Sequence, residues 1–276
     1  MSDMPKSIMI IGAAKCGTTT LYNHLVQHPD ICEGIIKEPE YFTINRGDEK
    51  YKNRSYISLF NIDLSKHKYT LDASTGYSMC HNEKGVAQRM KDYGLNPFII
   101  YIVRNPLDRI RSHYNFSKGN LNGDHKIDSL HFLSTSSYFK QLEQYRKVFG
   151  KSRMLIVEFD DLKKNPGLLC RKIFKFLGSA AFDIQIKTQV YNQTQPTNRK
   201  RLQVVQKLQT YSIKRFIPTE IKEWGKSILT KALPDKNEDL SKIQEASMKK
   251  NLYADMVSLQ REYSIDIGKW GFQHDS

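Results

Sequence analysis

A short apolar run that enters a glycine loop and then a helix is the feature that most restricts the fold of this 276-residue chain. Ile8–Ile11 is followed by Gly12 and Gly17, and Thr18–Gln27 has the spacing of a helix. Two glycines at this separation let the backbone pass close to a phosphate, and the first amides of the helix favour an anion there. The segment therefore predicts a buried strand, a P-loop-like turn and a helix.

The loop is nevertheless not a Walker A motif. In that motif a lysine follows directly after the second glycine and reaches the terminal phosphates of a nucleoside triphosphate. Here Lys15 precedes Gly17, and threonines fill positions 18 to 20. The sequence predicts phosphate binding without the arrangement typical of a kinase or an ATPase.

Two further apolar runs are each followed by a turn and a helix. Phe98–Val103 leads into a helix at Leu107–Phe116. Met154–Phe159 leads into a second helix at Leu168–Leu177, and Tyr69–Asp72 is a further strand candidate. Parallel strands need such crossovers, and strands buried on both faces are uniformly apolar. We predict an α/β fold with a central parallel sheet flanked by helices.

No repeat, low-complexity tract or linker divides the chain, so a single domain over residues 1–276 is expected. Its nucleotide-binding core is expected over about residues 6–200, and the part from about 201 to 276 is expected to be helical. The helical segments in that part are expected at roughly 201–216, 219–231 and 239–263.

The chain lacks the marks of a membrane or disulfide-stabilised protein. No apolar run approaches the roughly 20 residues of a membrane helix, and the start has no apolar stretch long enough for a secretory signal. The four cysteines are scattered without a CxxC pair, which argues against a disulfide framework and a cysteine-rich zinc site. We expect a cytoplasmic protein without a transmembrane segment or a bound metal.

The formal net charge of +14 predicts an anionic partner. Residues 140–231 carry +13 and residues 1–139 only +3, while residues 232–276 carry −2. Nucleic acid is not favoured, because the chain has no RNP motif, helix-turn-helix signature or zinc-finger spacing. The basic excess is expected either as solvated helix surface or as the border of a cleft for an acidic acceptor.

The end of the second apolar run separates this chain from magnesium-dependent nucleotide enzymes. Such enzymes usually end the corresponding strand in an aspartate that holds the metal. Here the strand ends in Arg104, whose guanidinium suits a phosphate, and Ser112 follows about two helical turns later. Together they predict a second phosphate site that needs no metal.

In combination, the two motifs resemble those of sulfotransferases that use 3′-phosphoadenosine 5′-phosphosulfate (PAPS). The nearest resemblance is to the branch of heparan sulfate and bacterial carbohydrate sulfotransferases. Gly12–Thr19 resembles the family's 5′-phosphosulfate loop, and Val103–Ser112 its 3′-phosphate motif. Val157–Gly178 and Tyr263–Trp270 are similar to later segments of the family.

The resemblance implies transfer of a sulfo group from PAPS to an acceptor hydroxyl or amine, without a metal and with 3′,5′-adenosine bisphosphate as product. Lys15 would stabilise the charge on the leaving phosphate. Arg104 and Ser112 would hold the 3′-phosphate. The residues implied for the 5′-phosphate are Lys15, Cys16, Gly17, Thr18, Thr19 and Thr20, and those implied to close over the nucleotide are Tyr191, Arg199 and Lys200.

For the general base, the resemblance points to Glu38 in the segment Lys37–Phe42. A glutamate needs a raised pKa or close contact with the acceptor to act as a base. Other sulfotransferase branches use a histidine, so His24, His28 and His113 are alternatives. Ala73 stands where the family often has a lysine near the acceptor. Either another cation takes its place or the acceptor lies differently.

Two other functions stay open. A small-molecule kinase of P-loop type is disfavoured by the position of Lys15 and by Arg104 in place of a metal-holding aspartate. A non-catalytic polyanion-binding protein rests on the net charge alone. A carbohydrate is the first choice of acceptor, with lipids, phenols and other small alcohols as alternatives, and the sequence indicates no oligomeric state.

Overall fold

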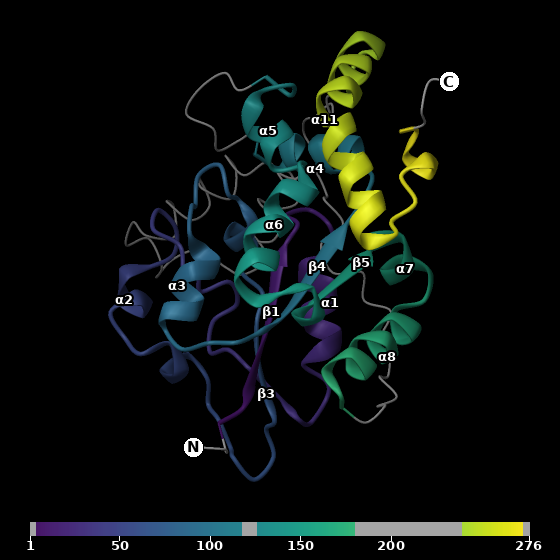
Figure 1. The fold of residues 1–276 in the computed structure, drawn as a ribbon. Coiled ribbons are helices and arrows are strands. Elements are labelled where there is room, and N and C mark those ends of the chain that lie inside the picture. Colours follow the sequence, from purple (N-terminus) through teal and green to yellow (C-terminus); the bar gives the residue numbers. More distant parts are fainter. Residues whose placement is uncertain (1–3, 118–125, 180–238, 273–276) are drawn as a thin grey trace, which may run out of the picture.

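The computed structural model describes residues 4–117, 126–179 and 239–272 (Figure 1). Five strands form one sheet in the order β2-β3-β1-β4-β5, and each neighbouring pair is parallel. The strands are β1 (Lys6–Gly12), β2 (Ile31–Glu33), β3 (Tyr69–Asp72), β4 (Phe98–Val103) and β5 (Met154–Glu158). The predicted α/β fold with a central parallel sheet is confirmed.

All four predicted strands form, with one difference at the end of β5. Phe159 was expected in that strand, but it begins the helix α7. The edge strand β2 was not predicted, because three residues are too few to show a period of two. None of the described helices has the length and apolar character that crossing a membrane requires.

The predicted helices after β1, β4 and β5 form, and the predicted C-terminal helix begins at Lys242, where Ser241 and Gln244 make a capping box. The helices predicted at 201–216 and 219–231 lie outside the described residues. The helices are α1 (Thr18–Leu25), α2 (Glu49–Lys52), α3 (Val86–Asp92), α4 (Pro106–Ser117), α5 (Leu130–Ser134), α6 (Tyr138–Phe149), α7 (Phe159–Lys164), α8 (Pro166–Leu177) and α11 (Lys242–Tyr263), with the 3₁₀ turns η1 (Tyr56–Leu59), η2 (Thr75–Ser78), η3 (Lys151–Arg153) and η4 (Gly268–Trp270).

Side chains on β4 alternate between the two faces of the sheet and thereby place helices on both. Phe98 packs against Phe176 of α8, with ring centroids 5.4 Å apart. Tyr101 points to the other face, where its hydroxyl donates to Gln141 of α6 at 2.8 Å. Figure 1 shows α1 with α8 and α3 with α6 as the two groups of helices around the strands.

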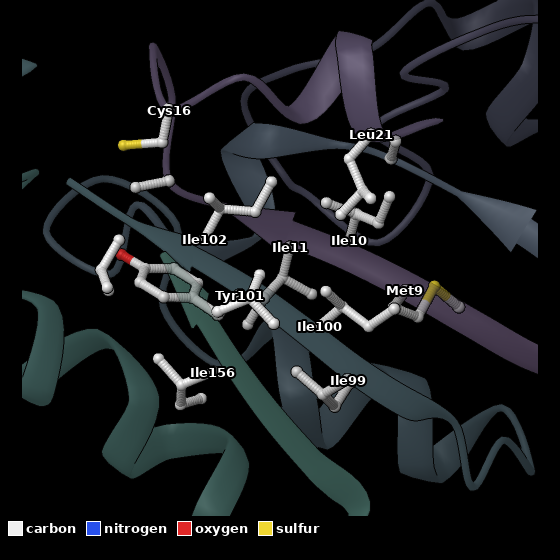
Figure 2. Close-up of a cluster of buried hydrophobic side chains, with 14 of the residues drawn as sticks. Met9, Ile10, Ile11, Cys16, Leu21, Ile99, Ile100, Tyr101, Ile102 and Ile156 are labelled. Carbon is white, nitrogen blue, oxygen red and sulfur yellow. The ribbon is translucent and has the colours of Figure 1, made fainter. Parts of the chain in front are cut away.

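The core lies along β1 and β4, the central strands of the sheet. Ile8–Ile11 and Ile99–Val103 are fully buried. Figure 2 shows the side chains of Met9–Ile11 and Ile99–Ile102 in one cluster with Leu21 of α1 and Ile156 of β5. Each such side chain contributes about 1.5–3 kcal/mol when it leaves water. This packing fixes the strand ends from which the site is built.

The carboxyl ends of β1, β3 and β4 meet at one edge of the sheet, as parallel strands require. The amide of Ala13 donates to the carbonyl of Ile102 at 3.0 Å, which joins the loops after β1 and β4. Ser78 of η2 lies against Gly12, because a Cβ on Gly12 would be 2.4 Å from the Ser78 Oγ. Three loops therefore converge at this edge.

Candidate active site

The glycine loop turns sharply into α1. Gly17, the N-cap of α1, has a φ of 84°, a left-handed conformation that favours glycine, and a Cβ there would lie 2.9 Å from the ring of Phe159. The first turn of α1 has neither an acidic side chain nor a side-chain cap. Its first amides and the positive end of the helix are thus suited to an anion.

Two cations from different strands meet at this loop. Lys15 Nζ lies 3.8 Å from the centroid of the Phe116 ring at the end of α4. Arg104, at the end of β4, brings Nη1 to 3.5 Å from the carbonyl oxygen of Lys15 and stacks its guanidinium 5.0 Å from the Phe159 ring. Residues 89 positions apart in the sequence thereby form one positively charged rim.

Ser112 lies on α4, half-buried, on the face that continues from Arg104. The guanidinium of Arg104 approaches the carboxylate of Asp108 to 4.0 Å, a contact between positions four apart. Since positions four apart on a helix share a face, Ser112 extends the same row by one turn. The carbonyl of Arg104 accepts a hydrogen bond from the hydroxyl of Tyr138 at 2.9 Å, which anchors this end of β4 to α6.

The other predicted loop residues differ in what they offer a ligand. Thr18 is buried, whereas Thr19 and Thr20 are half-buried. Cys16 is fully buried, and burial raises the pKa of its thiol to about 11. The amide of Cys16 donates to the carbonyl of Ala13 at 3.1 Å. Cys16 is therefore a neutral packing residue within the loop.

Arg109 is a cation beside the glycine loop that the sequence did not predict. Its side chain is fully buried in α4, and its charge acts on Cys16 of the glycine loop. Nε donates to Ser136 Oγ at 2.7 Å, Nη2 donates to the Phe132 carbonyl at 2.8 Å, and Nη1 lies 3.0 Å from His113 Nδ1. Within the described parts of the chain, no carboxylate pairs with it.

Two carboxylates lie on the segment after β2, and they have opposite environments. Glu38 has a side chain 32% exposed and paired with Lys37. Glu40 is only 5% exposed, and its Oε1 accepts a hydrogen bond from the amide of Gly76 at 2.8 Å. Burial is the main reason that the pKa of Glu40 is raised to about 7. The prediction named the first of these carboxylates and overlooked the second, although both stand in one short motif.

The backbone is strained at the same positions. Four non-glycine residues of the described chain have a positive φ, and three of them are Lys15, Glu38 and Glu40, at 70°, 56° and 52°. Such conformations cost free energy and concentrate where a site must hold a side chain in a fixed direction. These three residues fall in the glycine loop and in the segment Lys37–Phe42 (the acidic segment), the two segments for which a role in the site is predicted.

The three alternative histidines are all buried. Burial, and next the charge of Arg109, lower the pKa of His113 to about 2, so its imidazole stays neutral. Burial also lowers the pKa of His24 on α1. The ring of His28 packs 4.6 Å from that of Phe174 on α8, and its Nδ1 accepts a hydrogen bond from the amide of Asp30. These environments favour a carboxylate over a histidine as the base.

Three predicted nucleotide residues, Tyr191, Arg199 and Lys200, lie outside the described residues. Within the residues that the structure does describe, no three histidine, cysteine or acidic side chains gather as they would around a metal ion. What the described residues bring together is a glycine loop, two cations from adjacent strands and an acidic segment.

Comparisons with known proteins agree on one family. The family model described as the sulfotransferase domain matches residues 5–251. The chain is 24% identical to carbohydrate sulfotransferase 15 of Homo sapiens over 239 residues, covering 61% of this chain and 43% of that protein. It is 26% identical to heparan sulfate glucosamine 3-O-sulfotransferase 3B1 of Mus musculus over 191 residues, covering 63% and 46%. The chain spans less than half the length of these curated relatives.

A solved structure has the same fold over nearly the whole chain. The sulfotransferase from Alicyclobacillus acidocaldarius superposes with a TM-score of 0.65 at 22% identity, covering 97% of this chain and 99% of that one. The five-stranded parallel sheet and its flanking helices are therefore a sulfotransferase fold.

Proposed function

The chain belongs to the sulfotransferase domain family, and we propose that it transfers a sulfo group from PAPS to a hydroxyl or amine of a carbohydrate acceptor. The observation that carries the proposal is the pair of cations, Lys15 and Arg104, at a glycine loop that opens a helix. Transfer of the sulfo group leaves new negative charge on the departing phosphate. A cation fixed beside that phosphate stabilises the transition state more than the ground state.

The donor is held by residues of two strand–loop–helix units. Lys15 contacts the leaving phosphate, and Arg104 and Ser112 bind the 3′-phosphate that distinguishes PAPS from ATP. The loop residues Cys16, Gly17, Thr18, Thr19 and Thr20 surround the 5′-phosphate, and Tyr191, Arg199 and Lys200 close over the nucleotide. The half-buried state of Thr19, Thr20 and Ser112 is consistent with these roles.

Glu38 takes the proton of the acceptor. Its side chain is exposed enough to meet a substrate, and its left-handed backbone holds it in a fixed direction. In-line transfer requires the base on the side of the sulfo group opposite the leaving phosphate. The acidic segment follows β2 and the glycine loop follows β1, so the two come from different parts of the sheet edge.

Recognition of the 3′-phosphate gives a direct test of the donor. We expect Arg104→Gln to weaken binding of 3′,5′-adenosine bisphosphate by about ten- to a hundredfold, because a charge-assisted contact is worth about 1.5–3 kcal/mol. Binding of AMP, which lacks that phosphate, should change little. Isothermal titration with the bisphosphate, AMP and ATP measures all three, and a preference of the unaltered protein for ATP with magnesium would refute PAPS as the donor.

The base is tested by an isosteric substitution. Glu38→Gln should lower kcat by about a hundredfold or more, because general-base catalysis contributes 10²- to 10⁴-fold. The affinity of this variant for the bisphosphate should stay the same. The matched control is Glu49→Gln, an exposed position on α2, which should leave kcat unchanged. Turnover is measured by mass spectrometry of reactions that contain PAPS and one of a panel of acceptors: neutral sugars, acidic polysaccharides and hydrophobic alcohols. Full activity of the Glu38 variant would show that another group takes the proton.

A further inference from the structure

A third cation, Arg46, reaches the sheet edge from the loop that follows the acidic segment. Its side chain is 42% exposed, and its Nε lies 3.6 Å from Oε1 of the buried Glu40. Among the described residues, the two terminal nitrogens of Arg46 have no hydrogen-bond partner. The terminal nitrogens of Arg46 thus face solvent as hydrogen-bond donors, while its Nε lies beside the carboxylate of Glu40.

The pair formed by Glu40 and Arg46 lies directly on the backbone of Gly76 in η2. A Cβ at Gly76 would be 2.2 Å from Glu40 Oε2 and 2.5 Å from Arg46 Nε, so no other residue fits there without displacing the pair. The same turn carries Ser78, which lies against Gly12 at the start of the glycine loop. A single 3₁₀ turn therefore separates this pair from the phosphate loop.

A shared neighbour supports the same placement. Burial lowers the pKa of His113 most, and the charges of Arg109, His131, Lys15 and Arg46 lower it further. Lys15 and Arg46 therefore both lie within electrostatic range of one imidazole. Arg46 therefore acts on the same imidazole as Lys15, from the side of the acidic segment.

Glu40 has one oxygen without a partner. Oε2 is buried and, within the described part of the chain, no donor reaches it. Buried polar atoms are rarely left unsatisfied. A ligand that reaches Oε2 would give this oxygen the partner it lacks.

The charged and titratable groups that act on Glu40 come from several parts of the chain. Glu38 lies on the acidic segment, Arg46 on the loop that follows it, Asp72 on β3 and Tyr145 on α6. Asp72 is fully buried and satisfied, since Ser74, Tyr77 and Tyr56 all donate to its carboxylate. Arg46 is the one cation among these groups, and its charge and the hydrogen bond from the Gly76 amide favour the ionised state of Glu40.

We propose that Arg46 binds an anionic group of the acceptor, a carboxylate or a sulfate, and that Glu40 takes up a proton when Arg46 turns from it to that group. This inference rests on the proposed function and specifies its substrate class, an acidic carbohydrate. The ionised carboxylates of Glu38 and Glu40 alone would repel such an acceptor. The protonated Glu40 no longer repels it, and its hydroxyl becomes a donor to the anion.

The direction of the pH dependence follows from the charges. Glu40 has a pKa of about 7 with Arg46 beside it. An arriving anion and the loss of Arg46 each favour the neutral carboxyl, so both raise this pKa further. Binding is therefore accompanied by proton uptake near pH 7, and the affinity for an acidic acceptor falls as the pH rises above about 7.

The test titrates three tetrasaccharides into the protein, with and without 3′,5′-adenosine bisphosphate. One alternates glucuronate and N-acetylglucosamine, the second is its O-sulfated form, and the third is neutral N-acetylglucosamine tetramer. The unaltered protein should bind the preferred charged form at least tenfold more tightly than the neutral one, and the first two arms show which anion is preferred. Arg46→Gln should abolish the preference and Arg46→Lys should restore part of it, while the exposed Arg54→Gln should leave it unchanged.

Proton uptake is measured by repeating the calorimetric titration at pH 7 in buffers of different ionisation enthalpy. Glu40→Gln should abolish the uptake and bind the charged tetrasaccharide more tightly than the unaltered protein at pH 8, which a loss of packing alone would not do. Equal affinity for charged and neutral forms, a preference that survives Arg46→Gln, or uptake that survives Glu40→Gln each overturns the inference. Failure to bind the bisphosphate would instead refute the proposed function.

Discussion

Lys15→Ala is expected to lower kcat for sulfuryl transfer by about a hundred- to a thousandfold, the usual effect of removing one group that stabilises charge developing in a transition state. Lys15 lies in the glycine loop, at φ 70°, and its ammonium group lies 3.8 Å from the centroid of the Phe116 ring at the end of α4. The negative charge on the leaving phosphate is larger in the transition state than in bound PAPS. The loss should therefore appear in kcat more than in KM.

Two control variants make the Lys15 result interpretable. Lys6→Ala removes an exposed lysine at the opposite end of β1 and should leave kcat unchanged. Lys15→Arg keeps the charge and should retain part of the activity. Steady-state kinetics with PAPS, together with thermal unfolding of each variant, separates a catalytic loss from a folding defect. A kcat within threefold of the unaltered protein in Lys15→Ala would exclude this role, and polyanion binding without sulfuryl transfer would favour a non-catalytic protein.

The parts of the fold that could be predicted are those encoded by local patterns. Ile8–Ile11 and Phe98–Val103 are apolar on both faces, and each is followed at once by a turn and a helix. The order of the strands is not local, and it is this order that makes β1 and β4 neighbours and joins Lys15 to Arg104. The motifs around Lys15 and Arg104 predicted two phosphate sites, and the order of the strands brings these two sites into contact.

The parts that could not be predicted depend on burial or on distant contacts. Arg109 shares the inner face of α4 with apolar residues, and an arginine within a helix is ordinarily assigned to the solvent side. Glu40 stands two residues after Glu38, and its burial and its contact with Gly76, 36 positions away, are tertiary features that the sequence does not show. The sequence left open whether another cation replaces the lysine absent at Ala73 or the acceptor lies differently, and only tertiary packing brings Arg46 to Glu40.

Arg109→Ala has the largest expected effect on stability, about 3–5 kcal/mol of the free energy of unfolding. The substitution removes a fully buried side chain and leaves a cavity in the layer between α4 and α5. It also removes the Arg109 donor from Ser136 Oγ and from Nδ1 of His113, and it leaves the carbonyl of Phe132 with the Thr135 hydroxyl alone. A buried acceptor without a donor loses the hydration it had in the unfolded chain, so the cavity and the lost bonds act in the same direction.

Arg111→Ala, two residues along the same helix, is the matched control. Arg111 pairs with Asp108, Asp239 and Glu245, but these partners are partly exposed, and ion pairs near the surface contribute about 0–1 kcal/mol each. Urea unfolding of both variants should therefore give a much larger loss for Arg109 than for Arg111, although the latter makes more ion pairs. Equal losses would mean that charge pairing, rather than the satisfaction of buried neutral acceptors, determines how α4 is held beneath the glycine loop.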